Sequence, residues 1–314
     1  MMDSRSVLLT SPRLTLQVSP TEGGRITSLI NRSTGTEWLF EGVDYPPLQA
    51  GCSFAEGPRG GFDECLPSVG PCMAPGWPAN TVGDHGDIWW RQWTVMDATD
   101  GRLVLQADFA DYPLSLVRSL EVLADAPRVR LEYEIRNKSD QPLPYLYSAH
   151  PLLALDEPMS IEISTGQLVH NAFGRTLETQ ACSHWPWVQT AAGRERMDHI
   201  EPEGAADNYK VFVKATGMVT VRRTATGESL QLLFDSSALP WVGVCVNRWG
   251  WPHEGAADRW VAIEPTTAPT DDLGRAHEAG WSRTLDPGDT HRWTLEIVLQ
   301  DSCGERTVSE TSHG

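Results

Sequence analysis

Alternation of apolar and polar residues with a period of two is the feature that most restricts how this chain can fold. Residues 128–137 read R-V-R-L-E-Y-E-I-R-N, and residues 13–19, 210–214 and 292–300 follow the same pattern. Such alternation places one face of a strand on a core and the other in solvent, as in antiparallel sheets. Further strands are expected at residues 102–109, 115–123, 229–235, 241–247 and 260–263.

Turn-forming residues separate these segments. Asp, Asn, Gly and Pro gather at residues 99–101, 125–127 and 286–289, as expected for tight turns between antiparallel strands. No convincing amphipathic helix longer than about three turns is found. We therefore predict an almost all-β chain, a large antiparallel sandwich with few short helices. No linker divides it, so residues 1–314 are expected to form one domain.

The charge of the chain restricts its partners. A net charge of −17 argues against nucleic acid, because phosphate binding needs a basic face, and it disfavours anionic membrane surfaces. No run of about 18 apolar residues predicts a membrane span. The first 14 residues lack the apolar stretch of a secretory signal, so a cytoplasmic protein is expected. A neutral small molecule remains compatible with these features.

Six cysteines occur, and none forms a C-x-x-C pair. Without a secretory signal, reduced thiols are the expected state. A zinc site from Cys52, Cys65 and Cys72 is conceivable, although their spacing does not support it.

Two regions break the strand pattern. Residues 51–86 are rich in Gly and Pro, and residues 191–207 are polar. Long irregular loops in compact domains are uncommon and often functional. Since the first region ends in D-H-G-D, we expect it to carry function, and we expect the second to be a rim loop.

Three ionisable residues lie at the ends of apolar runs or in Gly-rich turns. Glu264 follows W-V-A-I, so partial burial would raise its pKa toward that of a useful base. His150 lies in an apolar stretch and suits proton donation, while His85 lies in a Gly-flanked turn. Each has an ordinary alternative role. Glu264 could be an acid that caps a turn, His150 a core histidine, and His85 an exposed loop histidine.

Two acidic pairs suggest glycosidase carboxylates. They are Asp63-Glu64 and Asp271-Asp272. Adjacent residues of a strand point to opposite faces, so each pair is expected to supply at most one site group.

Several segments together resemble the aldose 1-epimerase (galactose mutarotase-like) family. Their order and spacing, across nearly the whole chain, carry the resemblance. They are G-G-R-I-T-S-L-I-N (23–31), R-G-G-F-D-E-C-L-P (59–67), G-D-H-G-D-I-W-W-R-Q-W (83–93), Y-S-A-H-P-L-L (147–153), A-I-E-P-T-T-A-P-T-D-D-L (262–273) and L-D-P-G-D-T-H-R-W-T-L-E (285–296).

This resemblance implies a β super-sandwich and an isomerase that interconverts the α and β anomers of a sugar by opening its ring. Glu264 in E-P would be the base, His150 in A-H-P the general acid, and His85 in H-G a substrate ligand. Asp207 in A-A-D-N-Y is the nearest match to an aspartate that contacts sugar hydroxyls. The resemblance implies no metal or organic cofactor, and a monomer or homodimer is expected.

The identity of the sugar stays open at this point. The segment from Arg59 is similar to the hexose-6-phosphate mutarotase branch, in which Arg59 and Arg91 would hold a phosphate. Both arginines have many acidic neighbours in sequence that would pair with them and repel a phosphate, so a neutral sugar is preferred. Aromatic residues that could face the sugar are Trp89, Trp90, Trp249 and Trp251.

Two other functions are compatible with the same sandwich. One is a carbohydrate-binding protein without turnover. The other is a polysaccharide lyase or glycosidase, for which Tyr147 and Asp207 are the candidate partners of Glu264. Fold alone does not decide among them.

Overall fold

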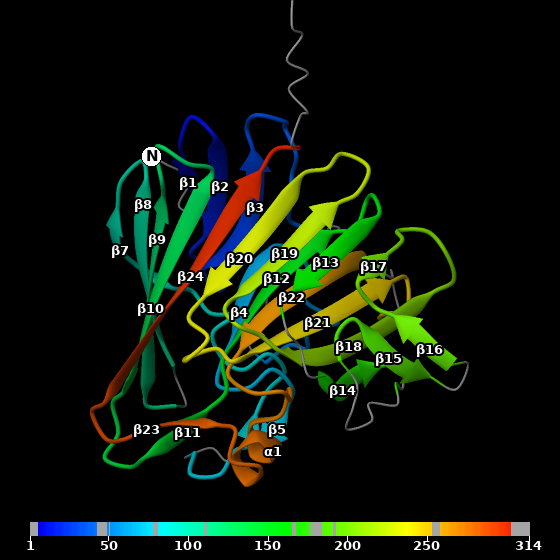
Figure 1. Ribbon diagram of the computed structural model, residues 1–314. Coiled ribbons are helices and arrows are strands. Elements are labelled where there is room, and N and C mark those ends of the chain that lie inside the picture. Colours follow the sequence, from blue (N-terminus) through cyan, green and yellow to red (C-terminus); the bar gives the residue numbers. More distant parts are fainter. Residues whose placement is uncertain are drawn as a thin grey trace, which may run out of the picture.

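The computed structural model describes residues 6–42, 49, 51–77, 81–109, 112–164, 168–175, 177, 184–190, 193–252 and 258–302. Two nine-stranded antiparallel sheets pack against each other in this part of the chain (Figure 1). The predicted all-β class is confirmed.

The first sheet has the order β1-β2-β3-β4-β12-β22-β21-β18-β14. Its strands are β1 (Val7–Thr10), β2 (Leu14–Ser19), β3 (Arg25–Asn31), β4 (Phe62–Cys65), β12 (Ser148–Ala154), β22 (Arg259–Thr266), β21 (Trp241–Arg248), β18 (Asp207–Lys214) and β14 (Leu168–Gly174).

The second sheet has the order β17-β13-β19-β20-β24-β10-β9-β8-β7. Its strands are β17 (His199–Ile200), β13 (Met159–Ile163), β19 (Met218–Arg223), β20 (Ser229–Phe234), β24 (Thr290–Gln300), β10 (Arg128–Asn137), β9 (Leu114–Val122), β8 (Arg102–Asp108) and β7 (Thr94–Ala98).

Three short hairpin-like pairs and one helix complete the elements of the described ranges. The pairs are β5 (Cys72–Met73) with β6 (Thr81–Val82), β11 (Leu143–Tyr145) with β23 (Arg283–Leu285), and β15 (Trp187–Thr190) with β16 (Gly193–Arg196). The helix is α1 (Leu273–Glu278). Within these ranges no helix has the length and apolar character needed to cross a membrane.

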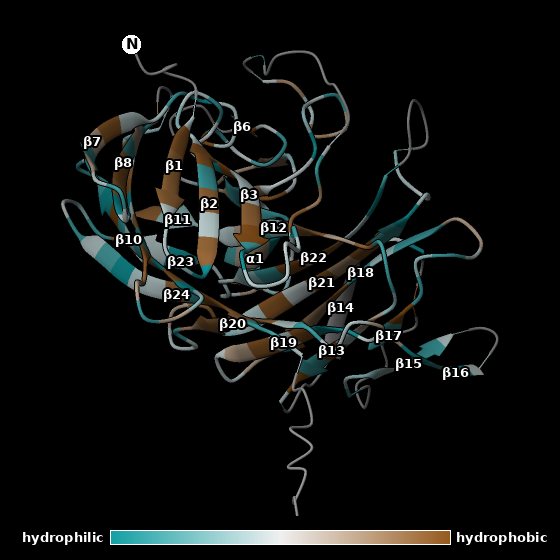
Figure 2. Ribbon diagram, turned by 90° about the horizontal axis from the view of Figure 1, so that it is seen from above, coloured by the Kyte–Doolittle hydropathy of each residue, from teal (hydrophilic) through white to brown (hydrophobic). Residues whose placement is uncertain are grey.

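Alternation builds the second sheet as the sequence predicts. Along β10, Val129, Leu131, Tyr133 and Ile135 are buried, while Glu132 between them is exposed. A similar change of hydropathy is visible in Figure 2 along β2, near one edge of the first sheet. One face of the sheet therefore packs on the inter-sheet core and the other meets solvent.

The middle of the first sheet is buried on both faces. In β22, Val261 and Ile263 belong to the main hydrophobic cluster, whereas Trp260 and Ala262 belong to a second, smaller cluster with Phe54. Segments that precede and follow β4 in sequence therefore cover the face that points away from the second sheet. A strand buried on both faces reads as an apolar run rather than an alternating one.

The two irregular regions contain more structure than the sequence predicts. The region at 51–86 includes β4, which pairs with both β3 and β12 in the middle of the first sheet. The region at 191–207 includes β16 and β17. The sequence showed little periodicity at 51–86 because the four residues of β4 are all buried, and such a run does not distinguish strand from loop. The segment expected as a rim loop at 191–207 contains two short strands.

A buried ion cluster joins the two sheets. Glu64 Oε1 accepts hydrogen bonds from Arg118 Nη1 and the Tyr133 hydroxyl, both at 2.8 Å, and Oε2 accepts one from the Tyr147 hydroxyl at 2.6 Å. Arg118 lies on β9, Tyr133 on β10 and Glu64 on β4, and the side chains of Arg118 and Glu64 are fully buried. Burial raises the pKa of Glu64, and the Arg118 guanidinium opposes this rise. The cluster holds β4 against the second sheet and fixes Glu64 as the side chain of β4 that faces it.

We predict that Arg118→Met lowers the free energy of unfolding by about 3–5 kcal/mol, because it leaves the Glu64 carboxylate buried without its cation. Arg102→Met is the control: Arg102 pairs with Asp97 on the exposed surface, and such pairs contribute at most about 1 kcal/mol. Urea unfolding at neutral pH measures both. Equal losses for the two variants would contradict the structural role of the cluster.

Candidate active site

Three ionisable side chains lie at adjacent positions on three neighbouring strands of the first sheet. Asp63 of β4 is paired with His150 of β12. β12 pairs with β22 both before and after His150, and the register of these pairs places His150 across from Glu264. Directly opposed side chains of an antiparallel pair lie on the same face, with Cβ atoms about 4.5–5.5 Å apart. The strands thus arrange Asp63, His150 and Glu264 in one row, on the face away from the second sheet.

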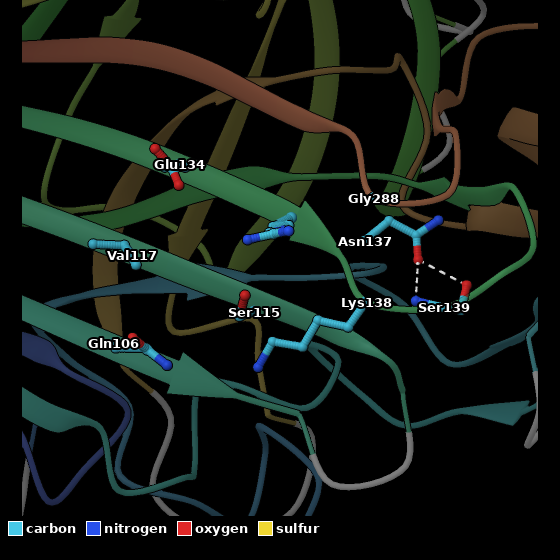
Figure 3. Close-up of a pocket in the computed structure, with 9 residues that line it drawn as sticks. Gln106, Ser115, Val117, Glu134, Asn137, Lys138, Ser139 and Gly288 are labelled. Atoms are coloured by element: carbon cyan, nitrogen blue, oxygen red, sulfur yellow. Dashed lines mark hydrogen bonds between the residues drawn. The ribbon is translucent and has the colours of Figure 1, made fainter.

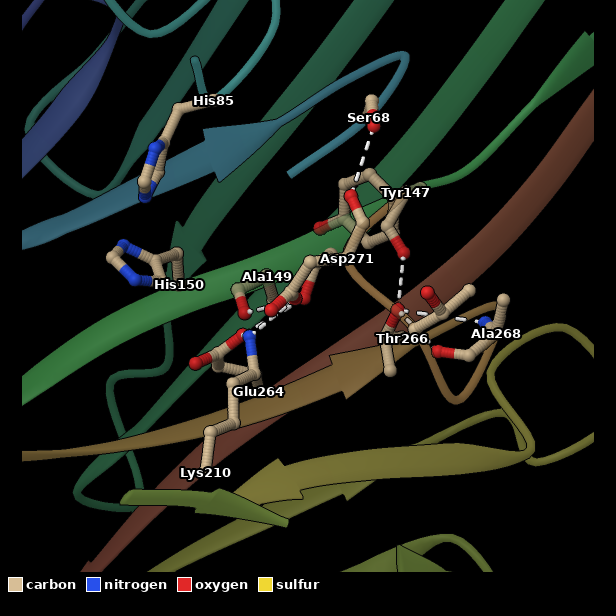
Figure 4. A network of polar contacts seen from close by, with 12 residues as sticks. Ser68, His85, Tyr147, Ala149, His150, Lys210, Glu264, Thr266, Ala268 and Asp271 are labelled. Atoms are coloured by element: carbon tan, nitrogen blue, oxygen red, sulfur yellow. Dashed lines mark hydrogen bonds and ion pairs between the residues drawn. The ribbon is translucent and has the colours of Figure 1, made fainter. Parts of the chain in front are cut away.

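The next position in this row is Gly243 on β21, paired with Glu264. A Cβ atom at Gly243 would lie 3.0 Å from Lys210 Cε and 3.3 Å from Glu264 Cβ. The missing side chain leaves room for Lys210 of β18 to reach over β21. Its Nζ donates to Glu264 Oε2 and to Asp271 Oδ1, both at 2.6 Å, as Figure 4 shows.

His85 is brought to the row by a tight turn. Its φ is 58°, and its backbone N–H donates to the Val69 carbonyl at 2.6 Å. The following Gly86 also has positive φ, and a Cβ there would lie 2.0 Å from the Leu66 carbonyl oxygen, so only glycine fits. The His85 ring stacks on Phe54 at 4.1 Å between centroids and lies 4.9 Å from the ring of His150.

His85, His150, Lys210 and Glu264 open onto one cavity of about 360 Å³, a volume within the range of small-molecule sites. Aromatic rings form much of its wall, and the polar groups lie together at its base. The lining residues are Phe54, Ala55, Val69, Gly70, Pro71, Asp84, His85, His150, Phe173, Lys210, Cys245, Trp251, Trp260, Glu264 and Asp271.

Asp63 sets the charge of His150. The Asp63 Oδ1 atom lies 2.9 Å from His150 Nδ1. Burial lowers the pKa of His150, but the Asp63 carboxylate outweighs it, so the pKa lies above its ordinary value of 6.5. Burial likewise raises the pKa of Asp63, and the His150 charge brings it below the ordinary range. An ionised Asp63 therefore favours the protonated form of His150.

The predicted rise in the pKa of Glu264 was wrong. Burial alone would raise it, but the ammonium of Lys210 and the charge of His150 outweigh burial and bring the pKa below the ordinary value. The rise in pKa was predicted from burial alone, because the sequence does not show that these cations lie beside Glu264. Glu264 is consequently an ionised carboxylate at neutral pH.

Three buried polar atoms at this site have no hydrogen-bond partner within the described part of the chain: Glu264 Oε1, Asp63 Oδ2 and Trp260 Nε1. Leaving such a group unpaired costs about 1–3 kcal/mol, and native proteins contain few of them. Two acceptors and one donor at this site therefore remain available to hydrogen-bond a bound molecule.

Six other residues singled out in the sequence do not line this cavity: Trp89, Trp90, Trp249, Asp207, Arg59 and Arg91. Asp207 lies 3.2 Å from Arg175 Nε. Trp249 is 46% exposed, and Trp251 lines the cavity instead. The two arginines pair with acids, as was expected in preference to phosphate binding: Arg59 pairs with Asp258, and Arg91 pairs with Asp87 at 2.7 Å.

The acidic pairs divide as predicted. Asp63 faces the cavity side and Glu64 the core, while Asp271 binds Lys210 and Asp272 accepts the Arg275 N–H as N-cap of α1. The hydroxyl of Tyr147 binds Glu64 in the core. The lyase interpretation therefore loses Tyr147 as the partner of Glu264.

The zinc site considered from Cys52, Cys65 and Cys72 does not form. Over the described residues the one group of three close potential ligands is Cys65, His85 and His150. The four cysteines of the described residues are free thiols, while Cys182 and Cys303 lie outside those residues.

A second hollow, of about 470 Å³, lies over β8, β9 and β10 (Figure 3). Two of its charged residues are paired at the surface: Glu134 accepts from Arg292, and Lys138 pairs with Asp108. Such pairs are solvated and weakly coupled. Although larger, this hollow holds no buried acid and base, so the cavity at His150 and Glu264 is the candidate active site.

Lys210, Asp84 and Trp260 are site residues that sequence reasoning missed. Lys210 lies in the alternating segment 210–214, where a lysine reads as solvent-facing. A strand that is buried on both faces has no solvent-facing position, so a lysine in it requires acidic partners. Recognising the segment as such a strand would have identified Lys210. Asp84 was considered only as an acidic neighbour; its Oδ1 lies 2.9 Å from His85 Nδ1.

Comparisons were made with known families, curated proteins and solved structures. No family model matches the chain, and no curated protein matches it. Solved structures do. A protein from Escherichia coli named as a candidate aldose 1-epimerase is 16% identical, with 94% of this chain and 99% of that chain covered and a TM-score of 0.69.

A galactose mutarotase related enzyme from Lactobacillus acidophilus is 13% identical, covering 95% of this chain and 98% of that one, with a TM-score of 0.66. The chain has the galactose mutarotase-like fold. A candidate aldose 1-epimerase from Klebsiella pneumoniae gives 17% identity, 92% and 77% coverage and a TM-score of 0.64. At these identities the likeness establishes the galactose mutarotase-like fold, and the chemistry must be argued from the site.

We predict that the imidazole of His150 titrates above pH 6.5 in the wild type and below it in Asp63→Asn, since the substitution removes the charge that outweighs burial. Because the folded-state pKa is raised, His150 adds stability below about pH 6.5, and this stability is lost as the pH rises through the folded value. Two-dimensional NMR of the histidine ring signals measures the titration.

Asp198→Asn is the control, since Asp198 pairs with His199 and lines no part of the cavity. This variant should leave the His150 titration unchanged. A wild-type midpoint below 6.5, or one unaffected by Asp63→Asn, would contradict the assigned electrostatics.

Proposed function

We propose that the protein is an aldose 1-epimerase that interconverts the α and β anomers of a free, uncharged sugar. One observation carries the proposal: the buried Glu264 carboxylate, with an oxygen that lacks a partner, lies in the same cavity and strand row as the carboxylate-held imidazole of His150. This is an acceptor and a donor of protons facing one small-molecule site.

Glu264 is the base in this proposal. Lys210 and Ser148 both contact Oε2, at 2.6 and 3.4 Å. Only Oε1 is therefore left to accept a hydrogen bond from the anomeric hydroxyl of the sugar. As the ring opens, Oε1 takes the proton from that hydroxyl, and the O1 electrons form the aldehyde carbonyl.

His150 is the acid. Its Nδ1 is occupied by Asp63, so Nε2 is the nitrogen that can donate to the ring oxygen. The C1–O5 bond breaks as O5 takes this proton. Rotation about C1–C2 and closure in reverse give the other anomer, with both protons returned to their original places. Positioned groups of this kind each contribute about 10²–10⁴-fold to the rate.

The remaining lining residues support sugar binding. The Phe54, Trp251 and Trp260 rings offer apolar faces for the C–H groups of a pyranose. Trp260 Nε1 offers a donor that is without a partner among the described residues, and His85 offers its second ring nitrogen.

The charge of the cavity favours an uncharged sugar over a sugar phosphate. Among the described residues that line it, Lys210 is the single lysine or arginine, and it is paired with Glu264 and Asp271. Asp84 also lines it, and the hydrogen bond from His85 helps keep the pKa of Asp84 low against the effect of burial. A phosphate would face the carboxylates of Asp84, Glu264 and Asp271, while the basic groups beside them, Lys210 and His150, are already paired with acids.

A sugar-binding protein without turnover is the second candidate. The specific observation that favours it is the Lys210 ammonium on Glu264, because it makes this carboxylate a weaker base. A protein that only binds the sugar would not accelerate the equilibration of its anomers, so the rate of equilibration separates the two candidates.

The deciding experiment follows freshly dissolved α-glucose and α-galactose by polarimetry. We expect the protein to accelerate equilibration, and we expect Glu264→Gln and His150→Asn each to reduce the catalysed rate by about 10²–10⁴-fold. Glucose 6-phosphate should be a poorer substrate than glucose.

Matched controls are Glu134→Gln and His291→Asn, the same substitutions at residues outside the cavity. Both should keep the wild-type rate. Sugar binding without acceleration would support the second candidate, and equal rates for all five proteins would remove the proposed roles of Glu264 and His150.

A further inference from the structure

Cys65, His85 and His150 bring three potential metal ligands together at the edge of the cavity. Their ligand atoms all lie within 4.8 Å of one another. Cys65 is fully buried and His150 is 4% exposed. Cys65 lies on the same face of β4 as Asp63, two residues away, and is paired with Ser148 of β12. The sheet register therefore places the thiol beside the two imidazoles.

Both imidazoles are oriented by carboxylates. Asp84 Oδ1 lies 2.9 Å from His85 Nδ1, and Asp63 Oδ1 lies 2.9 Å from His150 Nδ1. Asp84 is itself fixed, since its Oδ2 accepts the Phe54 N–H at 2.8 Å. Metal-binding histidines almost always have such a partner on the second nitrogen, which fixes the tautomer and ring orientation. Here the carboxylates leave Nε2 of each histidine for a metal.

We propose that Cys65 Sγ, His85 Nε2 and His150 Nε2 form a binding site for a thiophilic divalent cation of the Zn²⁺ type. One thiolate and two imidazoles are a ligand set that zinc accepts, and three protein ligands leave a fourth position open to the cavity. The nearby carboxylates of Asp63 and Asp84 balance the charge of the cation. Binding displaces the proton of the Cys65 thiol and the proton that His150 carries on Nε2, so affinity rises with pH.

The site has a consequence for activity that rests on the proposed function. The metal would occupy the two imidazoles to which that function assigns acid catalysis and sugar binding. Zn²⁺ and sugar would then exclude each other, and the cation would act as a reversible inhibitor.

Titration with Co²⁺, a spectroscopic substitute for Zn²⁺, tests the site directly. With a non-thiol reductant present, we expect one equivalent of Co²⁺ to produce a thiolate-to-metal charge-transfer band that Zn²⁺ abolishes. Cys65→Ser and Cys65→Ala should both lose the band. Cys245→Ser is the matched control, because Cys245 is a buried cysteine that lines the same cavity but does not belong to the ligand group.

The carboxylate partner gives a graded variant. Asp84→Asn should keep the band but weaken Zn²⁺ affinity by about 10–100-fold, as loss of such a partner usually does. Circular dichroism confirms that each variant is folded. A band that persists without Cys65, or disappears with Cys245→Ser, or is absent from the wild type, overturns the metal site.

Inhibition of mutarotation by Zn²⁺, present in the wild type and absent in Cys65→Ser, tests the consequence. If the protein has no mutarotase activity, the charge-transfer experiment still decides the metal site, so the two proposals can fail separately.

Discussion

The antiparallel pairing of β4 with β12 carries two adjacent carboxylates to opposite faces of the first sheet. Asp63 faces the cavity side and holds His150, while Glu64 faces the core and binds Arg118. A shift of the pairing by one residue would exchange these faces and bury each acid without its partner. The ion cluster that joins the two sheets thereby also fixes the register in which the candidate active site forms.

The charges around the cavity give its acid and its base opposite protonation states at the same pH. Asp63 favours the protonated form of His150, and Lys210 helps keep Glu264 ionised. Since Gly243 has no side chain, Lys210 can reach Glu264 from two strands away. The ammonium reduces the basicity of Glu264, but without it the carboxylates of Glu264 and Asp271 would have no cation between them, and their repulsion would favour protonation of one.

Sequence predicted the part of the fold that alternates. The strands at 128–137 and 229–235 were found because each has one face turned to solvent. The buried strands β21 and β22 were found as apolar runs, whereas β4 and β12 were missed, because Asp63, Glu64 and His150 interrupt their apolar character. Glu264, His150 and His85 were brought into one cavity as expected. Lys210 was missed because its partner Asp271 is far away in the sequence. For the same reason Asp207 was wrongly expected at the sugar, since its partner is Arg175.

The central claim is that one sugar molecule contacts residues 264 and 150 at the same time. A crystal structure of the Glu264→Gln variant with bound glucose or galactose tests it most directly. The account predicts the anomeric oxygen within hydrogen-bond distance of the side chain at position 264, and the ring oxygen within that distance of His150 Nε2. A sugar bound with either oxygen turned away from these groups, or bound only in the hollow over β8, β9 and β10, would contradict it.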